Sequence, residues 1–183
     1  MEAACASLTE SGDRVLVLDN GIFGHGFAEF VELYGGQALL LQSSEKEAFD
    51  IEILEKFLEK DHDFKYATIV HCDTPSGVLN DLSKICPLLK KYGILTVVDS
   101  VAAMGGEDLQ VDNLQIDIAL GGSQKVLSAP PGLTIVSISP LAYQAMENRQ
   151  SPIASFYCNL LTFKDYYEKN GFLTQCQFQT FMD

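Results

Sequence analysis

The sequence contains few basic residues. Twelve lysines and arginines stand against 25 aspartates and glutamates, which gives a formal net charge of -13. Only Arg14 and Arg149 are arginines. Proteins that bind nucleic acid neutralise phosphates with lysine and arginine, and attraction to anionic lipid has the same origin. The composition therefore disfavours nucleic acid and membrane surfaces as partners.

Long apolar runs and a cysteine framework are also missing. No apolar run approaches the roughly 20 residues that span a bilayer, and residues 1–14 lack the basic and apolar regions of a signal peptide. The cysteines are Cys5, Cys72, Cys86, Cys158 and Cys176. Their odd number and the lack of a Cys-x-x-Cys pair disfavour a disulfide framework and a zinc site. We therefore expect reduced thiols in the cytoplasm and no metal site, with His25 and His71 in structural roles.

Six short runs rich in valine, isoleucine and leucine alternate with segments of helical pattern. The runs span residues 14–19, 37–42, 67–72, 94–99, 116–120 and 133–139. They lack strict alternation of apolar and polar residues, as expected of strands covered on both faces. Helices are predicted over 49–60, over 80–93 with Gly93 as a C-cap, and from Ser139, which precedes Pro140. This order predicts an α/β fold with three layers, α/β/α, around a mainly parallel sheet.

Residues with useful chemistry follow four of the predicted strands. The segments that carry them are "NGIFGHG", "DTPSG", "DSVAAMGG" and "GGSQK". In open parallel sheets, ligands bind beyond the carboxyl ends of the strands. We therefore expect one edge of the sheet to be approached by Phe23, Thr74, Asp99 and Lys125.

These four side chains together predict a site for pyridoxal 5′-phosphate. The amine of Lys125 can form an imine with an aldehyde cofactor, and the carboxylate of Asp99 can keep a pyridine nitrogen protonated. The ring of Phe23 can stack on the cofactor ring, and the Thr74 hydroxyl can bond its ring oxygen. Plainer interpretations stay open, because Phe23 could belong to the core and Thr74 could form a turn with Gly77.

Five segments resemble the class V, fold type I aminotransferases, most closely the alanine–glyoxylate and serine–pyruvate group. They are "MEAACASLTESGDRVLVLDNGIFG", "HCDTPSGVLNDL", "GILTVVDSVAAMGG", "IDIALGGSQKVLSAPPGL" and "SPIASFYCNL". The resemblance implies the large-domain fold of these enzymes, with Lys125 as the imine lysine and Asp99 as the pyridinium partner. It also implies Thr74 near the ring oxygen, Phe23 stacked on the ring and Gln124 near the phosphate. Gln124 favours this group over aminoethylphosphonate transaminases, which tend to carry asparagine before the lysine, and over cysteine desulfurases, which usually carry histidine.

The sequence also departs from this family. Full-length members are much longer, with a phosphate-binding glycine and serine turn before the helix that "MEAACASL" resembles. Their later small domain holds an arginine that grips the substrate carboxylate, and neither Arg14 nor Arg149 matches it by context. The ending "FLTQCQFQTFMD" departs from the family pattern as well. We therefore expect a chain truncated at both ends. Residues 1–150 would form the cofactor-binding core of the large domain, and 151–183 would begin the connection toward a largely missing small domain.

The resemblance implies a transamination through a Lys125 imine. The amino donor would be of the alanine or serine type, and the acceptor a 2-oxo acid such as glyoxylate or pyruvate. A homodimer is implied too, because the family builds its site where two chains meet. The alternative is a non-catalytic remnant of the large domain, or one part of a split enzyme. A nicotinamide-binding protein is disfavoured, because the glycines of "GIFGHG" reverse the Rossmann order and Lys125 would have no role.

Overall fold

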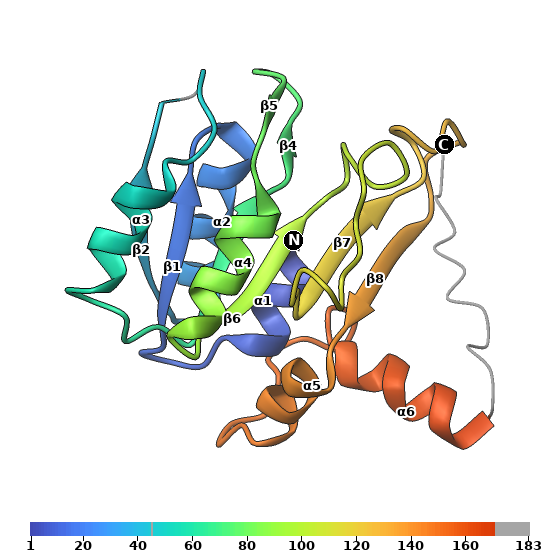
Figure 1. The fold of residues 1–183 in the computed structure, drawn as a ribbon. Helices are drawn as coiled ribbons and strands as arrows, with labels where there is room; N and C mark the ends of the chain where they lie inside the picture. Colours follow the sequence, from blue (N-terminus) through green and yellow to red (C-terminus); the bar gives the residue numbers. More distant parts are fainter. Residues whose placement is uncertain (45, 171–183) are drawn as a thin grey trace.

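The computed structural model describes residues 1–44 and 46–170 of the chain. Six strands form one sheet in the order β2-β1-β3-β6-β7-β8 (Figure 1). Every neighbouring pair is parallel except β7 and β8, so the prediction of a mainly parallel sheet is confirmed. The strands are β1 (Arg14–Asp19), β2 (Gln37–Gln42), β3 (Tyr66–Val70), β6 (Leu95–Asp99), β7 (Ile118–Gly122) and β8 (Thr134–Ile138). A separate antiparallel pair joins β4 (Cys72–Asp73) to β5 (Val78–Leu79).

Helices cover both faces of the sheet (Figure 1). One face packs against α1 (Glu2–Leu8), α2 (Ile22–Leu33), α5 (Pro140–Glu147) and α6 (Leu160–Asn170). The other face packs against α3 (Ile51–Leu58) and α4 (Leu82–Lys91). The structure therefore has the three α/β/α layers that the sequence predicts.

The central strands are apolar on both sides because each side faces a core. In β1, Val15 and Val17 belong to the core under α1 and α2, whereas Leu16 and Leu18 belong to the core under α3 and α4. All four side chains are fully buried. Successive side chains of a strand point to opposite faces, so a strand between two helical layers needs apolar residues at every position.

Local signals set the ends of several helices. The Ser139 hydroxyl accepts a hydrogen bond from the Ala142 N–H at 3.1 Å, and Pro140 is the first residue of α5, as predicted. Gly93 follows α4 with φ of 76°, a left-handed conformation that suits glycine and ends the helix. The helix expected over 49–60 is shorter, because Asp50 caps it by accepting from the Glu52 N–H at 2.8 Å.

Two strand predictions need correction. The run at 67–72 splits into β3 and β4, and the strand expected at 116–120 is displaced to Ile118–Gly122. Asp117 stays outside β7 because its carboxylate accepts from Lys90 Nζ and from the Thr96 N–H. The strand continues through Gly121, where a side chain would overlap the sulfur of Met104. Close packing therefore requires a glycine inside the strand.

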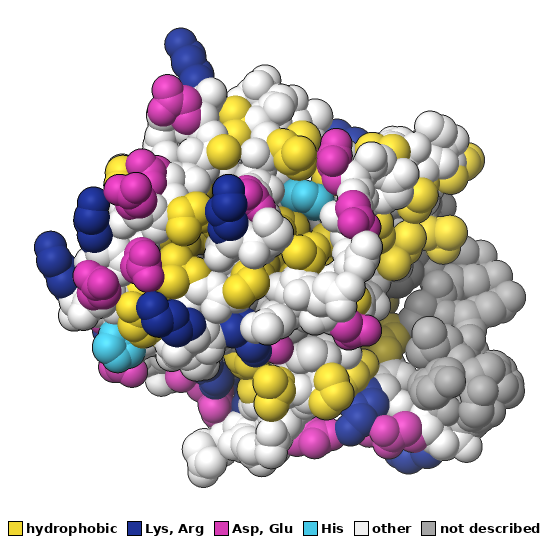
Figure 2. Space-filling view, viewed as in Figure 1, with side chains coloured by type: hydrophobic (Ala, Val, Ile, Leu, Met, Phe, Trp, Pro, Cys, Tyr) yellow, Lys and Arg dark blue, Asp and Glu magenta, His cyan; other side chains and the backbone are white. Residues whose placement is uncertain are grey.

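The surface over α3 and α4 carries both signs of charge. Figure 2 shows Lys and Arg side chains lying among Asp and Glu side chains on this face. Lys56 pairs with Glu52 at 3.5 Å and Lys91 with Glu55 at 3.2 Å. No helix among the described residues is long and apolar enough to cross a membrane.

Some predictions fall on residues that the structure does not describe. Cys176 and the segment "FLTQCQFQTFMD" lie outside the described residues, as does the end of the region expected to connect to a small domain. The cysteines within the described part are free, and they are Cys5, Cys72, Cys86 and Cys158.

Candidate active site

The carboxyl ends of four parallel strands meet at one edge of the sheet. Asp99 is the last residue of β6 and lies in register with Val70 of β3 and Leu120 of β7. At the end of β1, Asp19 accepts from Gln42 Nε2 at 3.3 Å and pairs with His25 Nδ1 at 3.0 Å. The segments that follow these strands are therefore neighbours in space, as the sequence rule requires.

Asp99 is a buried carboxylate at this edge, with 6% of its surface exposed. Its Oδ1 accepts one hydrogen bond, from the Val101 N–H at 2.9 Å. Burial raises the pKa of Asp99 above its ordinary value, and the negative charge of Asp73 adds to this rise. The Val101 hydrogen bond, the α-amino group of Met1 and the amine of Lys125 act in the opposite direction. A single hydrogen bond thus fixes the Asp99 carboxylate, and nearby positive groups offset its negative charge only in part.

Lys125 lies in an exposed loop whose shape depends on Ser123. The Ser123 hydroxyl donates to the Pro130 carbonyl at 2.7 Å and accepts from the Leu133 N–H at 3.3 Å. The Ser128 N–H donates to the Lys125 carbonyl at 2.9 Å and closes a turn. The positive charge of Lys125 acts to lower the pKa of Asp99, but burial of the carboxyl group outweighs it.

The other three predicted residues lie on segments at the same edge. Phe23 is the second residue of α2 and is 40% exposed. Thr74 is exposed in the turn that follows β4, and Gln124 lines a cavity of about 410 Å³ that also contacts Val101. None of the hydrogen bonds between described residues joins these three side chains to Asp99 or Lys125. The structure therefore places Asp99 and the segments that carry the other four residues at the same edge of the sheet.

Sequence reasoning missed Asp73, which precedes Thr74. Only 1% of its surface is exposed, and its Oδ2 accepts from the Ser76 hydroxyl at 2.9 Å and from the Ser76 N–H at 3.3 Å. A methyl group added at Gly21 would lie 2.5 Å from Asp73 Cγ, so the carboxylate packs directly on that glycine. The run "HCDTPSG" contains the residue, but no sequence signal shows that its side chain turns inward.

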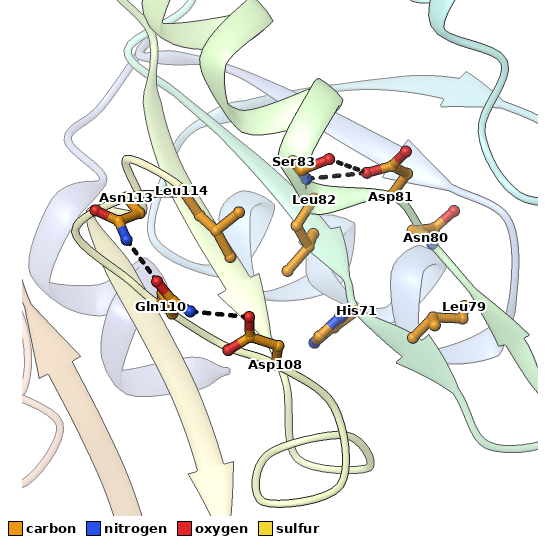
Figure 3. Close-up of a pocket in the computed structure, with 10 residues that line it drawn as sticks. All are labelled: His71, Leu79, Asn80, Asp81, Leu82, Ser83, Asp108, Gln110, Asn113 and Leu114. Atoms are coloured by element: carbon orange, nitrogen blue, oxygen red, sulfur yellow. Dashed lines mark hydrogen bonds between the residues drawn. The ribbon is translucent and has the colours of Figure 1, made fainter.

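A polar cavity of about 410 Å³ opens near the end of β3, beside the start of α4 (Figure 3). His71 lines it, with Nδ1 3.0 Å from Ser100 Oγ, and burial lowers the pKa of this histidine. The polar residues around it largely bond one another, since Gln110 Nε2 donates to Asp108 and Ser83 donates to Asp81. None of the residues predicted for the cofactor site lines this cavity. The contact of His71 with Ser100 links the ends of β3 and β6.

The fold and this edge define the class of protein. A mainly parallel sheet lies between two helical layers, with an accessible lysine and a buried acid beyond its carboxyl ends. The chain belongs to the class V aminotransferases, because the model of the family "Aminotransferase class-V" matches residues 2–169. This family depends on pyridoxal phosphate in general.

Individual relatives agree with this assignment. The alanine–glyoxylate aminotransferase of Rattus norvegicus is 35% identical over 160 residues, which cover 87% of this chain and 38% of the relative. The pyridoxamine–pyruvate transaminase of Mesorhizobium japonicum is 34% identical over 156 residues, covering 85% of this chain and 40% of the relative. The crystal structure of ureidoglycine–glyoxylate aminotransferase from Bacillus subtilis superimposes with a TM-score of 0.88 at 31% identity, covering 97% of this chain and 46% of that one. The chain therefore spans less than half the length of these relatives.

Proposed function

We propose that this chain carries the cofactor-binding lysine and acid of an aminotransferase that uses pyridoxal 5′-phosphate. The names of the three relatives each contain glyoxylate or pyruvate, whereas the amino compound differs among them. A small 2-oxo acid is therefore the acceptor that we propose, with an amino donor of the alanine or serine type. The observation that carries the proposal is the placement of Asp99 at the end of β6 and of Lys125 in the loop that follows the neighbouring parallel strand β7.

The residues at the edge fit the ring of this cofactor. Asp99 is a buried carboxylate with a single hydrogen bond, and a protonated ring nitrogen would supply the positive charge that it lacks. Phe23 presents an exposed aromatic ring and Thr74 an exposed hydroxyl, which match an aromatic ring and its oxygen. Gln124 lines a cavity beside Val101 and offers an amide for phosphate oxygens.

Each residue would have a separate task. When bound, the cofactor supplies an electron sink for the carbon that bears the substrate amino group. Lys125 Nζ would attach the cofactor and, once released, would take the proton from that carbon. Asp99 would hold the proton on the ring nitrogen from its buried position. Phe23 would cover one face of the ring and exclude water from it.

A homodimer is part of this proposal. Neither arginine stands at the carboxyl edge to grip a substrate carboxylate. Arg14 pairs with Asp61 at 2.6 Å, and Arg149 donates to the Ser7 carbonyl at 3.2 Å and to the Thr9 carbonyl. The group that binds the substrate carboxylate would therefore lie outside the described residues. The homodimer is proposed because this family builds its site where two chains meet, and sedimentation of the purified protein tests whether a second copy is present.

Borohydride trapping tests the proposed attachment directly. The protein is mixed with pyridoxal 5′-phosphate, reduced with borohydride, digested and examined by mass spectrometry. We expect the added mass on Lys125 and its loss in Lys125→Ala, together with the absorbance of the bound cofactor. Lys56→Ala is the matched control, because Lys56 is exposed on α3, on the far side of a helical layer. Labelling spread over surface lysines, and unchanged in Lys125→Ala, would contradict the proposal.

A second candidate is a chain that needs another polypeptide to be active, or that has lost activity. Within the described residues β8 pairs only with β7, and Ile135 on this edge strand is 42% exposed. An uncovered edge strand invites pairing with a further strand. Transamination of alanine with glyoxylate by the purified chain alone, lost in Lys125→Ala, would exclude this candidate.

A further inference from the structure

Two segments that carry proposed cofactor contacts lie directly against each other. The first is the turn of residues 100–107, here called the β6 turn, and it follows Asp99. The second is the loop of residues 123–132, here called the lysine loop, and it carries Lys125. The β6 turn fixes the Asp99 carboxylate through the Val101 N–H, at 2.9 Å. The contacts between the two segments therefore bear on where the lysine lies relative to the acid.

Two glycines of the β6 turn receive the side chains that follow Lys125. A methyl group added at Gly106 would lie 2.8 and 3.2 Å from the two γ carbons of Val126. One added at Gly105 would lie 2.7 Å from Leu127 Cδ2. Carbon atoms in contact are normally farther apart than this, so the two side chains occupy the space that a Cβ atom would need. The glycine pair is therefore a seat for the residues directly after the lysine.

The lysine loop is constrained on both sides of Lys125. Just before the loop, a side chain at Gly121 would overlap the sulfur of Met104 in the β6 turn. After the lysine, the Ser128 N–H donates to the Lys125 carbonyl at 2.9 Å, and Ser128 has φ of 53°. This left-handed conformation is unfavourable for serine and persists only where the surrounding structure imposes it. Lys125 thus begins a strained turn that packs on the β6 turn.

The side chains on the glycine pair lie outside the two cores of the protein. Val126 is 43% exposed and Leu127 is 44% exposed, and neither belongs to the core on either face of the sheet. An apolar side chain stabilises a fold mainly through its removal from water, so these two contribute less in this way than core residues do. Their packing on the glycine pair instead fixes the loop beside Lys125.

We propose that Gly106 and Val126 are positioning residues that act through Lys125. Both γ carbons of Val126 lie against Gly106, so rotation of the side chain leaves at least one of them there. A larger residue at position 106 would therefore displace the backbone of Val126, and Lys125, its neighbour in the chain, would move with it. The inference rests on the proposed function, in which Lys125 attaches the cofactor.

The backbone makes Gly106 the better position for a test. Gly105 has φ of 92°, so alanine there would strain the backbone as well as meet Leu127. Gly106 lies outside this left-handed region. Gly106→Ala therefore adds the contact with Val126 and little else, and Val126→Ala removes both γ carbons that cause it.

NMR of the cofactor-free protein tests the seat without any assumption about catalysis. In the wild type we expect a nuclear Overhauser contact between the α protons of Gly106 and the methyl groups of Val126. Gly106→Ala should shift the backbone amide signal of Lys125. In the double variant Gly106→Ala/Val126→Ala, this signal should return to the position that it has in Val126→Ala alone. Absence of the wild-type contact would overturn the inference, even if Gly106→Ala failed to fold.

Titration with pyridoxal 5′-phosphate, followed by the absorbance of the bound cofactor, tests the effect on the lysine. Gly106→Ala should weaken binding roughly tenfold, because the displaced amine no longer meets the aldehyde in the right geometry. The double variant should recover most of this loss, since the contact is relieved. Affinities are compared where urea unfolding shows each variant to be fully folded, so a loss of stability alone does not lower them.

Gly26→Ala is the matched control, because its methyl group would meet only Met1 Cε, at 3.8 Å. It should bind the cofactor as the wild type does. Wild-type affinity in Gly106→Ala, or no recovery in the double variant, would overturn the inference and leave the proposed function standing. No attachment to Lys125 in the wild type would instead overturn the proposed function, and the NMR measurements would then decide whether Gly106 positions the lysine.

Discussion

Two buried aspartates at opposite edges of the sheet, Asp117 and Asp99, differ in how their charge is compensated. At the amino edge, Asp117 is 2% exposed, and its carboxylate accepts from Lys90 Nζ at 3.0 and 2.8 Å and from the Ser139 hydroxyl at 2.8 Å. At the carboxyl edge, Asp99 is 6% exposed and, among the described residues, accepts a hydrogen bond from the Val101 N–H alone. Asp117 and Asp99 are therefore similarly buried, but the ion pair and hydrogen bonds offset the charge of Asp117 more fully than that of Asp99. This difference suits Asp117 to a stabilising role and Asp99 to the binding of a ligand.

Other charged residues at the amino edge of the sheet are also held in ion pairs. Arg14 lies at the amino edge, where it pairs with Asp61 at 2.6 Å. Lys65 lies there too, and it pairs with Asp13 at 2.6 Å and with Glu10 at 3.3 Å. The strand ends at this edge are joined by ion pairs, whereas at the carboxyl edge Asp19 pairs with His25 but Asp99 has a single hydrogen bond among the described residues. A protein can keep such unpaired groups at a functional site when the rest of the fold supplies the stability.

The largest expected effect compares the two aspartates directly. Asp117→Asn should lower the free energy of unfolding by about 3 kcal/mol, because it leaves the ammonium of Lys90 without its buried partner. Asp99→Asn should stay within about 1 kcal/mol of the wild type, because no ion pair is broken and a buried charge is removed. Urea unfolding of both variants at neutral pH gives the two values.

The contrast between the two edges of the sheet depends on the difference in unfolding free energy between Asp117→Asn and Asp99→Asn. Lys56→Ala, which removes an exposed helical pair with Glu52, should change the free energy of unfolding by less than about 0.5 kcal/mol and serves as the baseline. If Asp99→Asn destabilised the protein as much as Asp117→Asn does, the carboxyl edge would have a structural role like that of the amino edge.

A smaller effect concerns packing at the carboxyl edge. Gly21→Ala should cost about 1–3 kcal/mol, because the new methyl group would meet the carboxylate of Asp73. Gly26→Ala, inside α2, meets only Met1 Cε at 3.8 Å, and it should stabilise the protein by about 0.5–1 kcal/mol through helix propensity. Thermal unfolding separates these opposite signs. Equal effects of the two substitutions would show that Asp73 can move aside, and its charge would then not be fixed.

Much of the fold could be predicted from the sequence, because the apolar runs of a sheet covered on both faces are long and continuous. The start of α5 at Ser139 and Pro140 was equally visible, because capping is a local interaction. The strand expected at 116–120 was displaced to Ile118–Gly122, and the glycine inside it, Gly121, packs against the side chain of Met104, which lies in another segment. Long-range packing of this kind leaves no local pattern.

In the candidate site too, the sequence predicts some residues and misses another. Asp99 follows an apolar strand and Lys125 lies in a loop after another, so the rule for parallel sheets places both at one edge. Asp73 was missed because its burial depends on the packing of Gly21 and on a hydrogen bond from Ser76. Sequence order can identify which strand end carries a residue, but it does not show which side chain turns inward.

The smallest expected effect is a difference in sign between the edges as pH changes. Burial acts to raise the pKa of Glu10, but hydrogen bonds from Ser151 and the ammonium of Lys65 outweigh it and lower this pKa from 4.5 to about 2. A lowered acid pKa contributes stability above the unfolded value, so this contribution is lost as pH falls from 4.5 toward 2. The raised pKa of Asp99 has the opposite consequence, since its contribution is complete below 3.8 and is lost as pH rises through the folded value. Urea unfolding across this range should show a shallower acid decline in Glu10→Gln and a smaller loss with rising pH in Asp99→Asn. A change of the same sign in both variants would mean that Glu10 and Asp99 do not differ in how their charge is compensated.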